Sequence, residues 1–384
     1  MQFLVLGAGM MGSAVAYDLS HAASDVEVVL ADVDPDAAAI AAQAIGHRVR
    51  PMQLDVRDPR ALSAALRGNA VVISAVSYAV NEAVTRAAID AGVHMCDLGG
   101  NNDVVDRQTR LDAEARARGV TIIPNCGLAP GLVNILALTG MQTFDSVEEI
   151  RLRVGGLPRH PRPPLNYQIV FSVEGLINEY TEPSEVIEDG EIRKVESMTG
   201  LETLLFPPPY GTMEAFHTSG GISTLARALK GRVRHLDYKT IRYPGHCDRF
   251  KTLLDLGFAA SEPVLAGTGV RTMREMFTEL LKRKLSFDEP DVVLARATFS
   301  GTVAAQHRTL EYECIDSYDA QSRMTAMMRT TAFPTSITAL LLADATITAR
   351  GVLMPEACVP GERMIAELVK RNVRITTRSS ESIP

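Results

Sequence analysis

The sequence lacks several features that mark particular classes of protein. No tryptophan occurs among its 384 residues, and its five cysteines lie far apart, with no C-x-x-C pair. This spacing argues against a disulfide framework or a zinc site, so we expect a reducing, cytoplasmic location and no bound metal. No uninterrupted apolar run approaches the roughly 18 residues that a membrane-spanning helix needs. We therefore expect no membrane span.

Basic residues are too few for a surface that binds polyanions. The chain carries 39 Lys and Arg against 46 Asp and Glu, a formal net charge of −7. This balance argues against a broad footprint for nucleic acid or an anionic membrane, and it leaves room for a small cationic pocket. The N-terminal MQFLVLG has no basic region before its apolar run, which indicates a first strand rather than a signal peptide.

Short apolar runs alternate with helical patterns through the first 125 residues. Strands are expected at 2–7, 26–32, 50–56, 70–76, 93–99 and 119–127, and helices at 10–22, 34–45, 58–66, 81–92 and 104–118. Strands that alternate with helices of this length predict βαβ units and a parallel sheet. Ligands of such sheets bind at the carboxyl ends of the strands.

The stretch LVLGAGMMGSAVAYDL places three glycines between the first strand and the first helix. Gly7 would form the tight turn, Gly9 would let the backbone approach a pyrophosphate, and Gly12 would let helix and strand pack closely. The helix begins with Met10 and Met11, and its N-terminus offers free N–H groups and a positive dipole end to phosphates. The stretch therefore predicts a dinucleotide-binding Rossmann domain.

Asp32 ends the second strand, 20 residues past the last glycine of this stretch. With Asp34 close behind, its carboxylate would accept both ribose hydroxyls of NAD and repel the 2′-phosphate of NADP, so we favour NAD. Asp55 ends the third strand and would either contact the adenine or cap the next helix. Ala75 and Val76 end the fourth strand, where the nicotinamide half should lie.

From about residue 128 the alternation fades and a strand-rich pattern follows. We expect a Rossmann domain over 1–127, an α+β substrate and dimerisation domain over 128–333, and a C-terminal segment over 334–384 that packs back on the first domain. Within that last segment, a helix is expected to begin at Pro334. The fold class is α/β with a second, mixed α+β domain.

Several segments resemble the saccharopine dehydrogenase family, namely LGAGMMG, NCGLAPG (125–131), MEAFHTSGG (213–221), KTIRYPGH (239–246) and GVLMPE (351–356). Within the family, the chain is most similar to the lysine 6-dehydrogenase branch. The resemblance implies NAD-dependent oxidative deamination of the ε-amino group of L-lysine, in lysine degradation. The products would be ammonia and 2-aminoadipate 6-semialdehyde, which cyclises. It also implies a homodimer or a dimer of dimers formed through the second-domain sheet.

Such a reaction needs groups that take or hold a proton, because hydride leaves only from the carbon of a neutral amine. The ε-ammonium has a reference pKa of about 10.4. Asp97 is the predicted base or amine anchor, with capping of its own loop as the alternative. Tyr78 would polarise the imine or line the site, and Cys126 would relay a proton or lie buried and inert. Arg242 would bind the α-carboxylate, or else belong to an ordinary ion pair.

Further residues are candidates for binding the substrate. His246 follows the candidate arginine in the same turn, and His217 and Thr218 lie in the AFHTSGG loop. Glu174 and Glu179 are candidates for an amino group of the substrate, and Glu174 is included in the predicted site. Their five-residue spacing separates them by about 140° on a helix, so both cannot face one ligand.

Two other functions stay open. An imine oxidoreductase of the saccharopine reductase or carboxynorspermidine synthase type would hold two or three carboxylates, with Arg159, Arg162 and Arg249 as further cations. A sensor that holds NAD without catalysis is the other possibility. Four polar residues argue against a sensor, namely Tyr78, Asp97, His217 and Arg242.

Overall fold

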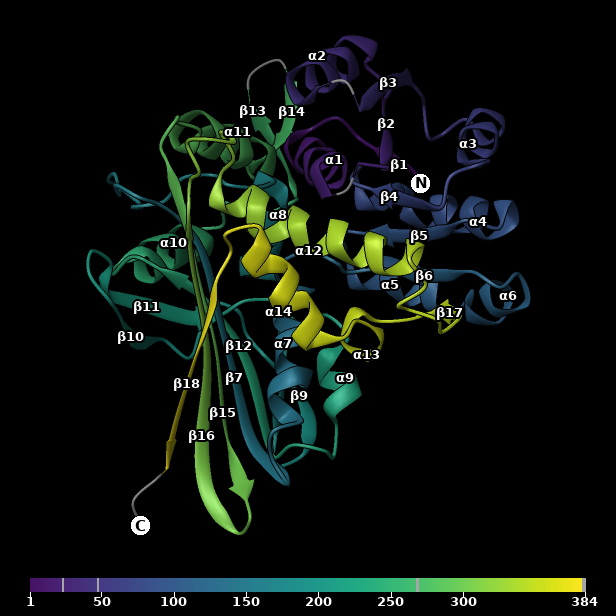
Figure 1. The fold of residues 1–384 in the computed structure, drawn as a ribbon. Helices are drawn as coiled ribbons and strands as arrows, with labels where there is room; N and C mark the ends of the chain where they lie inside the picture. Colours follow the sequence, from purple (N-terminus) through teal and green to yellow (C-terminus); the bar gives the residue numbers. More distant parts are fainter. Residues whose placement is uncertain (23, 47, 267–268, 382–384) are drawn as a thin grey trace. The chain divides into compact units, whose positions relative to one another are not determined.

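The computed structural model describes residues 1–22, 24–46, 48–266 and 269–381. The chain divides into two compact units (Figure 1). The first consists of Met1–Gln142, Ile222–Leu225 and Met328–Arg374, and the second of Thr143–Gly221, Ala226–Met327 and Ile375–Pro384. Each unit therefore combines segments that are far apart in the sequence.

A seven-stranded parallel sheet forms the centre of the first unit. Its strands are β1 (Gln2–Leu6), β2 (Glu27–Asp32), β3 (Val49–Gln53), β4 (Val71–Ser74), β5 (His94–Asp97), β6 (Thr121–Ile123) and β17 (Gly351–Val352). Their spatial order is β17-β6-β5-β4-β1-β2-β3. From β1 the chain adds β2 and β3 on one side of the sheet, and it then adds β4, β5 and β6 on the other side. Ligands of doubly wound sheets bind at this switch point between β1 and β4. The predicted Rossmann fold is confirmed.

Helices connect and cover these strands. They are α1 (Met10–Ala22), α2 (Pro35–Ile45), α3 (Pro59–Leu66), η1 (Tyr78–Val80), α4 (Asn81–Ala91), α5 (Asn102–Thr109), α6 (Asp112–Ala117), α7 (Leu132–Met141), α12 (Ala326–Ala343), α13 (Pro355–Cys358) and α14 (Gly361–Lys370). Asp58 caps α3 by accepting the N–H groups of Arg60 and Ala61. In the part of the chain that the structure describes, none of the helices has the length and apolar character needed to cross a membrane.

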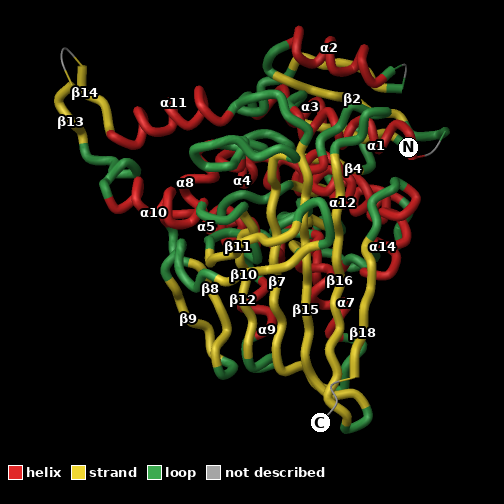
Figure 2. Tube along the Cα trace, turned by 90° about the vertical axis from the view of Figure 1, so that its left-hand side faces the viewer, coloured by secondary structure: helices red, strands yellow, loops and turns green. Residues whose placement is uncertain are grey.

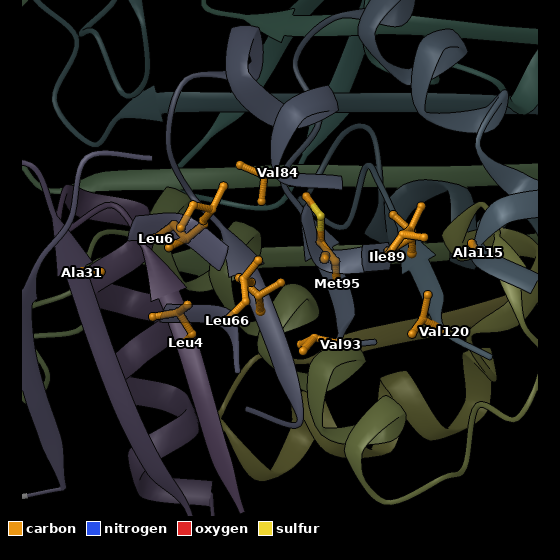
Figure 3. Packing of buried hydrophobic residues seen from close by; sticks show 14 of the residues in the cluster. Leu4, Leu6, Ala31, Leu66, Val84, Ile89, Val93, Met95, Ala115 and Val120 are labelled. Atoms are coloured by element: carbon orange, nitrogen blue, oxygen red, sulfur yellow. The ribbon is translucent and has the colours of Figure 1, made fainter. Parts of the chain in front are cut away.

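Apolar side chains from strands and helices form the core of this unit (Figure 3). Leu4 and Leu6 of β1 and Met95 of β5 pack in one cluster with Leu66 of α3 and Val84 of α4. All five are fully buried, and burying a side chain of this size stabilises the fold by roughly 1.5–3 kcal/mol. This packing holds the carboxyl ends of the strands in place for the candidate site.

The C-terminal part of the chain differs from the prediction in two respects. Its last strand, β18 (Ile375–Glu381), pairs with β16 (Gln306–Ser317) in the sheet of the second unit and not with the first unit. Helix α12 begins at Ala326, so Pro334 lies inside the helix and not at its start. Proline removes one helical hydrogen bond, but its neighbours Phe333 and Ile337 are buried, and this packing outweighs the local cost. Beyond the helix, β17 pairs in parallel with β6, which returns this segment to the first unit.

A nine-stranded mixed sheet forms the second unit, with β7, β15, β16 and β18 running side by side (Figure 2). Seven strands follow the order β10-β11-β12-β7-β15-β16-β18, β8 pairs with β12, and β9 pairs with β8. The β7–β12 pair is parallel. Their bounds are β7 (Ser146–Pro158), β8 (Ser184–Glu188), β9 (Glu191–Val195), β10 (Glu202–Phe206), β11 (Gly211–His217), β12 (His235–Arg242), β15 (Asp291–Val303), β16 (Gln306–Ser317) and β18 (Ile375–Glu381).

The remaining elements of this unit are a two-stranded hairpin and short helices. They are β13 (Pro263–Ala266), β14 (Gly269–Thr272), α8 (Val173–Thr181), α9 (Leu225–Leu229), α10 (His246–Asp255) and α11 (Met273–Leu285). An aromatic core joins α8, α10 and α11 to the sheet through Tyr180, Phe250, Phe277 and Phe216. The predicted mixed α+β character of this half is confirmed.

Candidate functional site

The glycine-rich turn of the first unit follows the carboxyl end of β1. Gly7 has a φ of 98°, a left-handed value that glycine adopts without strain, and its N–H donates to the Ala31 carbonyl (2.7 Å). A Cβ on Gly12 would lie 1.8 Å from the Gly7 carbonyl oxygen, so only glycine lets α1 begin so close to the turn. A Cβ on Gly9 would meet no atom of the described chain within 4 Å. The space beside Gly9 is therefore open.

Ala75 and Val76 adjoin this turn from the end of β4. The Ala75 N–H donates to the Leu6 carbonyl (2.8 Å), and the Ala75 carbonyl oxygen would lie 2.7 Å from a Cβ on Gly7. The Val76 side chain would lie 3.2 Å from the same Cβ. These residues thus lie at the switch point between β1 and β4, where the ligand of such a sheet binds.

The first residues of α1 complete the arrangement. Met10 opens the helix and is 56% exposed, and Met11 follows it. The first N–H groups of a helix lack partners within it and carry the positive end of the dipole. With the open space beside Gly9, this helix end fits the pyrophosphate of a dinucleotide.

Asp32 ends β2 beside the turn. Its Oδ2 accepts the N–H of Ala8 (2.7 Å), and its Oδ1 accepts the N–H of Asp34 (3.0 Å). The first bond ties the carboxylate to the glycine-rich turn. Each carboxylate oxygen keeps a further lone pair, which could accept a ribose hydroxyl.

Asp55 forms a local ion pair. Its carboxylate accepts hydrogen bonds from the backbone N–H (2.9 Å), Nε (2.9 Å) and Nη2 (2.8 Å) of Arg57. These bonds lower the pKa of Asp55 to about 2. Since Asp58 caps α3, the interpretation of Asp55 as the helix cap is wrong. Its contact with adenine stays a prediction.

Asp97 ends β5 and is fully buried. Its Oδ1 accepts the N–H groups of Gly99 (2.7 Å) and Asn125 (3.2 Å), and its Oδ2 accepts Nε2 of Gln108 (2.7 Å). Burial raises the pKa of Asp97, and the three hydrogen bonds oppose that rise. Asn125 has a left-handed φ of 63°, so Asp97 stabilises an uncommon turn. The geometry favours loop capping over the predicted role as a base.

The other two candidates for proton transfer differ in accessibility. Tyr78 is 37% exposed, and a Cβ on Gly100 would lie 3.0 Å from its ring. Cys126 is buried, and its Sγ donates to the Ile123 carbonyl (3.2 Å). Burial raises the pKa of the Cys126 thiol well above its ordinary value, so the thiol is protonated near neutral pH. This environment favours the inert alternative for Cys126.

Arg242 ends β12 in the second unit and is only 2% exposed. Its Nε donates to the Tyr180 hydroxyl (2.7 Å), and its Nη1 donates to the Ile241 carbonyl (2.9 Å). The guanidinium carbon lies 4.6 Å from the centre of the Tyr167 ring. Within the described ranges, no carboxylate oxygen approaches this guanidinium to 4.0 Å, so the alternative of an ordinary ion pair is wrong.

A chain of hydrogen bonds orients Arg242. The Leu165 carbonyl can only accept, so Nδ1 of His246, at 2.8 Å, carries the proton and donates to it. His246 Nε2 then accepts from the Tyr180 hydroxyl (3.1 Å), whose oxygen accepts from Arg242. Burial and the nearby guanidinium lower the pKa of His246 to about 3, which keeps the ring neutral. Both ring nitrogens of His246 are engaged in this chain, so His246 helps to position Arg242.

Glu214 of β11 supports the same turn and was not among the predicted residues. Its Oε2 accepts the N–H of Gly245 (2.8 Å), and its Oε1 accepts the N–H of Cys247 (2.6 Å) at the start of α10. Glu214 lies directly opposite Arg242 in the β11–β12 register. Only this strand pairing brings the carboxylate to a turn some 30 residues away, so no local sequence pattern could indicate it.

Strand alternation separates His217 from Arg242. His217 pairs with Lys239 in the register, three residues before Arg242 on the same strand. Because successive residues point to opposite faces of a sheet, His217 and Arg242 lie on opposite faces, and the predicted grouping of the two is wrong. Thr218 hydrogen-bonds through Oγ1 to Oγ1 of Thr240 (2.6 Å), which shares the face of Arg242.

The two glutamates of α8 have different surroundings. The Glu174 side chain is 54% exposed, pairs with Nη2 of Arg274 (2.8 Å) and accepts from Oγ1 of Thr278 (2.8 Å). This surface ion pair favours a structural role for Glu174, and its contact with a substrate stays a prediction. Glu179 is partly buried. Burial raises the pKa of Glu179 to about 7, and Arg242 opposes that rise.

Two family models match the chain. They describe the saccharopine dehydrogenase NADP binding domain, over residues 3–123, and the saccharopine dehydrogenase C-terminal domain, over residues 127–373. A saccharopine dehydrogenase (NADP+, L-glutamate-forming) of Pyricularia oryzae is 25% identical over 66% of this chain and 58% of its own. The mitochondrial alpha-aminoadipic semialdehyde synthase of Mus musculus is 24% identical over 92% of this chain and 45% of its own. The chain thus spans about half the length of these relatives.

Solved structures share the fold. The apo saccharopine dehydrogenase (L-Glu forming) of Saccharomyces cerevisiae has a TM-score of 0.83 at 20% identity, over 99% of both chains. The homospermidine synthase of Legionella pneumophila, in complex with NAD, has a TM-score of 0.69 at 13% identity, over 99% of this chain and 91% of its own. The lysine 6-dehydrogenase branch stays a prediction. The matched models cover both halves of the sequence, and the chain belongs to the saccharopine dehydrogenase family.

Proposed function

We propose that the protein is a nicotinamide-dinucleotide-linked oxidoreductase that oxidises a carbon–nitrogen bond of an α-amino acid. The observation that carries the proposal is the guanidinium of Arg242, which is buried and bonds only neutral oxygens. A buried charge without a hydrogen-bonded counter-charge is costly, and the α-carboxylate of a substrate would supply one through charge-assisted hydrogen bonds.

Within this class, we propose the ε-deamination of L-lysine as the first candidate, because lysine carries one carboxylate. Saccharopine carries three carboxylates and would need more cations than Arg242. The other arginines considered for that pocket are engaged or exposed. Arg162 pairs with Glu289 (3.1 Å), Arg249 donates to a backbone carbonyl (3.1 Å), and Arg159 is exposed.

A second candidate is the oxidation of saccharopine with release of L-glutamate. The names of the relatives from Pyricularia oryzae and Saccharomyces cerevisiae support it. Both candidates use the same kind of reaction, in which an amine is oxidised to an imine and water then releases the products. They differ in how many carboxylates the substrate presents.

The chain's own residues would bind, orient and handle protons. A bound nicotinamide would accept the hydride. Arg242 would hold the α-carboxylate, kept in orientation by Tyr180 and His246. Tyr78 is our candidate for the group that moves a proton, because its side chain is 37% exposed and it opens η1, the element that follows β4. Asp97 would position the loop at the end of β5.

We propose NAD as the preferred cofactor. The carboxylate of Asp32 is tied to the glycine-rich turn by Ala8, and it would repel a 2′-phosphate there while accepting the ribose hydroxyls of NAD. The matched family model and several relatives carry NADP in their names. Cofactor choice is therefore the property in which this chain would differ from them.

A panel of substrates tests these proposals. Purified protein is given NAD or NADP with L-lysine, saccharopine or 1,5-diaminopentane, and the absorbance of the reduced nicotinamide is followed. Turnover of lysine with NAD supports the first candidate, and turnover of saccharopine alone supports the second and contradicts the first. No turnover despite dinucleotide binding would favour the sensor. The expected homodimer or dimer of dimers would be tested by light scattering.

A further inference from the structure

We propose that Glu179 binds the α-ammonium group of the amino acid whose carboxylate Arg242 holds. The two residues would then select for zwitterionic α-amino acids over ligands that lack either charge. This inference rests on the proposed function, in which Arg242 binds the α-carboxylate. It adds Glu179 as a residue that determines specificity.

The backbone of Glu179 is joined to the hydrogen-bond network that orients Arg242. Glu179 immediately precedes Tyr180 in α8, and the Tyr180 hydroxyl accepts from Nε of Arg242 (2.7 Å). The Glu179 carbonyl accepts the N–H of Ser219 (3.0 Å), which ties this end of the helix to the loop after β11. The two charged residues are therefore held by neighbouring, mutually bonded segments of one unit.

Neither group forms an ion pair or a hydrogen bond with an opposite charge in the part of the chain that the structure describes. The Glu179 carboxylate makes no hydrogen bond and no ion pair among these residues, and Arg242 donates only to a hydroxyl and a carbonyl. Glu174, on the exposed side of the same helix, has both an ion pair and a hydrogen bond. An α-amino acid carries an ammonium and a carboxylate on one carbon. The carboxylate of Glu179 would match the ammonium, and the guanidinium of Arg242 would match the carboxylate.

The surroundings of Glu179 make its charge sensitive to pH. The charged and titratable groups that interact electrostatically with Glu179 are Arg242 and Tyr238 of β12, Tyr180 of α8, and Tyr167 in the segment before α8. Burial raises the pKa of all three tyrosines, so they are neutral near neutral pH. Burial also raises the pKa of Glu179 to about 7, against the lowering effect of Arg242.

A ligand ammonium favours the ionised form of a carboxyl group. Below a pH of about 7, most Glu179 side chains would be protonated and would bind an ammonium weakly. Affinity for an α-amino acid should therefore rise as the pH increases through about 7. A ligand without the α-ammonium should not show this rise.

Calorimetry on the full chain with NADH bound tests the inference. The ligands are L-lysine, 6-aminohexanoate, which lacks the α-ammonium, and 1,5-diaminopentane, which lacks the carboxylate. We expect wild type to bind lysine about tenfold more tightly than 6-aminohexanoate, equivalent to about 1.4 kcal/mol. Glu179→Gln should bring the two ligands within about twofold, and the exposed control Glu182→Gln should keep the tenfold difference.

Two results would overturn the inference. The first is equal affinity of wild type for lysine and 6-aminohexanoate. The second is a Glu179→Gln variant that weakens both ligands equally, as a mere counter-charge for Arg242 would. If Glu179→Gln fails to fold, Glu179→Asp replaces it and should keep a reduced discrimination with the same pH trend. Lysine turnover by wild type tests the proposed function separately, so the two failures are distinguishable.

Discussion

The two units hold their functional charges in different ways. In the first, the carboxylates of Asp32 and Asp97 accept hydrogen bonds largely from backbone N–H groups of adjoining turns. In the second, Arg242 is oriented by the Tyr180 hydroxyl, 62 residues away, and by an aromatic ring. The cofactor half of the chemistry thus depends on backbone shape, and the substrate half depends on individual side chains. The predictions below test this contrast.

The largest effects on stability and on NADH affinity are expected from substitutions at Gly12 and Gly9, because the cofactor half depends on the backbone shape of the glycine-rich turn. Gly12→Ala places a Cβ 1.8 Å from the Gly7 carbonyl oxygen, so the free energy of unfolding should fall by about 3 kcal/mol. Gly9→Ala meets no described atom within 4 Å, so its stability should stay within about 0.5 kcal/mol of wild type. The same Gly9 variant should nevertheless bind NADH at least about tenfold more weakly, because its methyl group occupies the space of the pyrophosphate.

Chemical denaturation and a fluorescence titration with NADH measure these two quantities. A Gly9→Ala variant that keeps wild-type affinity would show that the pyrophosphate does not approach this backbone. A Gly12→Ala variant of unchanged stability would contradict the close approach of α1 to the turn.

A smaller effect is expected at Asp32. Asp32→Asn keeps an oxygen that can accept the N–H of Ala8 but loses the charge, so the preference for NAD over NADP should fall about tenfold. Asp36→Asn is the matched control, because Asp36 is an exposed carboxylate in the first turn of α2 and its substitution removes the same charge. Ratios of kcat/KM for the two cofactors measure the preference. Loss of preference in the control alone would reject the assignment of Asp32.

The smallest effect is expected at Asp97. Burial raises its pKa in the folded state, so its contribution to stability is greatest at low pH and declines as the pH rises through the folded value. Asp97→Asn should remove this decline and change the free energy of unfolding by about 1 kcal/mol, since Oδ1 can still accept from Gly99 and Asn125. Denaturation at several pH values measures it.

Catalysis by the same variant separates the two roles of Asp97. A positioning residue should leave kcat within about tenfold of wild type. A loss of about 10³-fold or more with unchanged stability would instead identify Asp97 as the general base, whose removal typically costs a factor of 10²–10⁴.

The fold of the first unit and the shape of its glycine-rich turn could be predicted because the pattern is local. Gly7, Gly12 and Asp32 lie within one βαβ unit, and their roles follow from the turn, the helix start and the strand end. The same local logic predicted a helix from residue 58, where Asp58 caps α3. It could not settle Asp97, because only the fold shows that three donors surround its carboxylate.

The substrate half depends on register and packing, which a single sequence does not contain. His217 and Arg242 lie in adjoining motifs, yet the β11–β12 register puts them on opposite faces. The spacing of Glu174 and Glu179 showed that both could not face one ligand, but not which of them is exposed. Pro334 lies inside a helix because buried neighbours outweigh a local preference.

The most direct test of the central claim is a crystal structure of the full chain with NADH and L-lysine. We expect the α-carboxylate of lysine to lie about 2.7–2.9 Å from a guanidinium nitrogen of Arg242. We also expect the hydrogen bond from Arg242 to Tyr180 to be kept. A structure in which the carboxylate is bound elsewhere, with the surroundings of Arg242 unchanged, would contradict this claim.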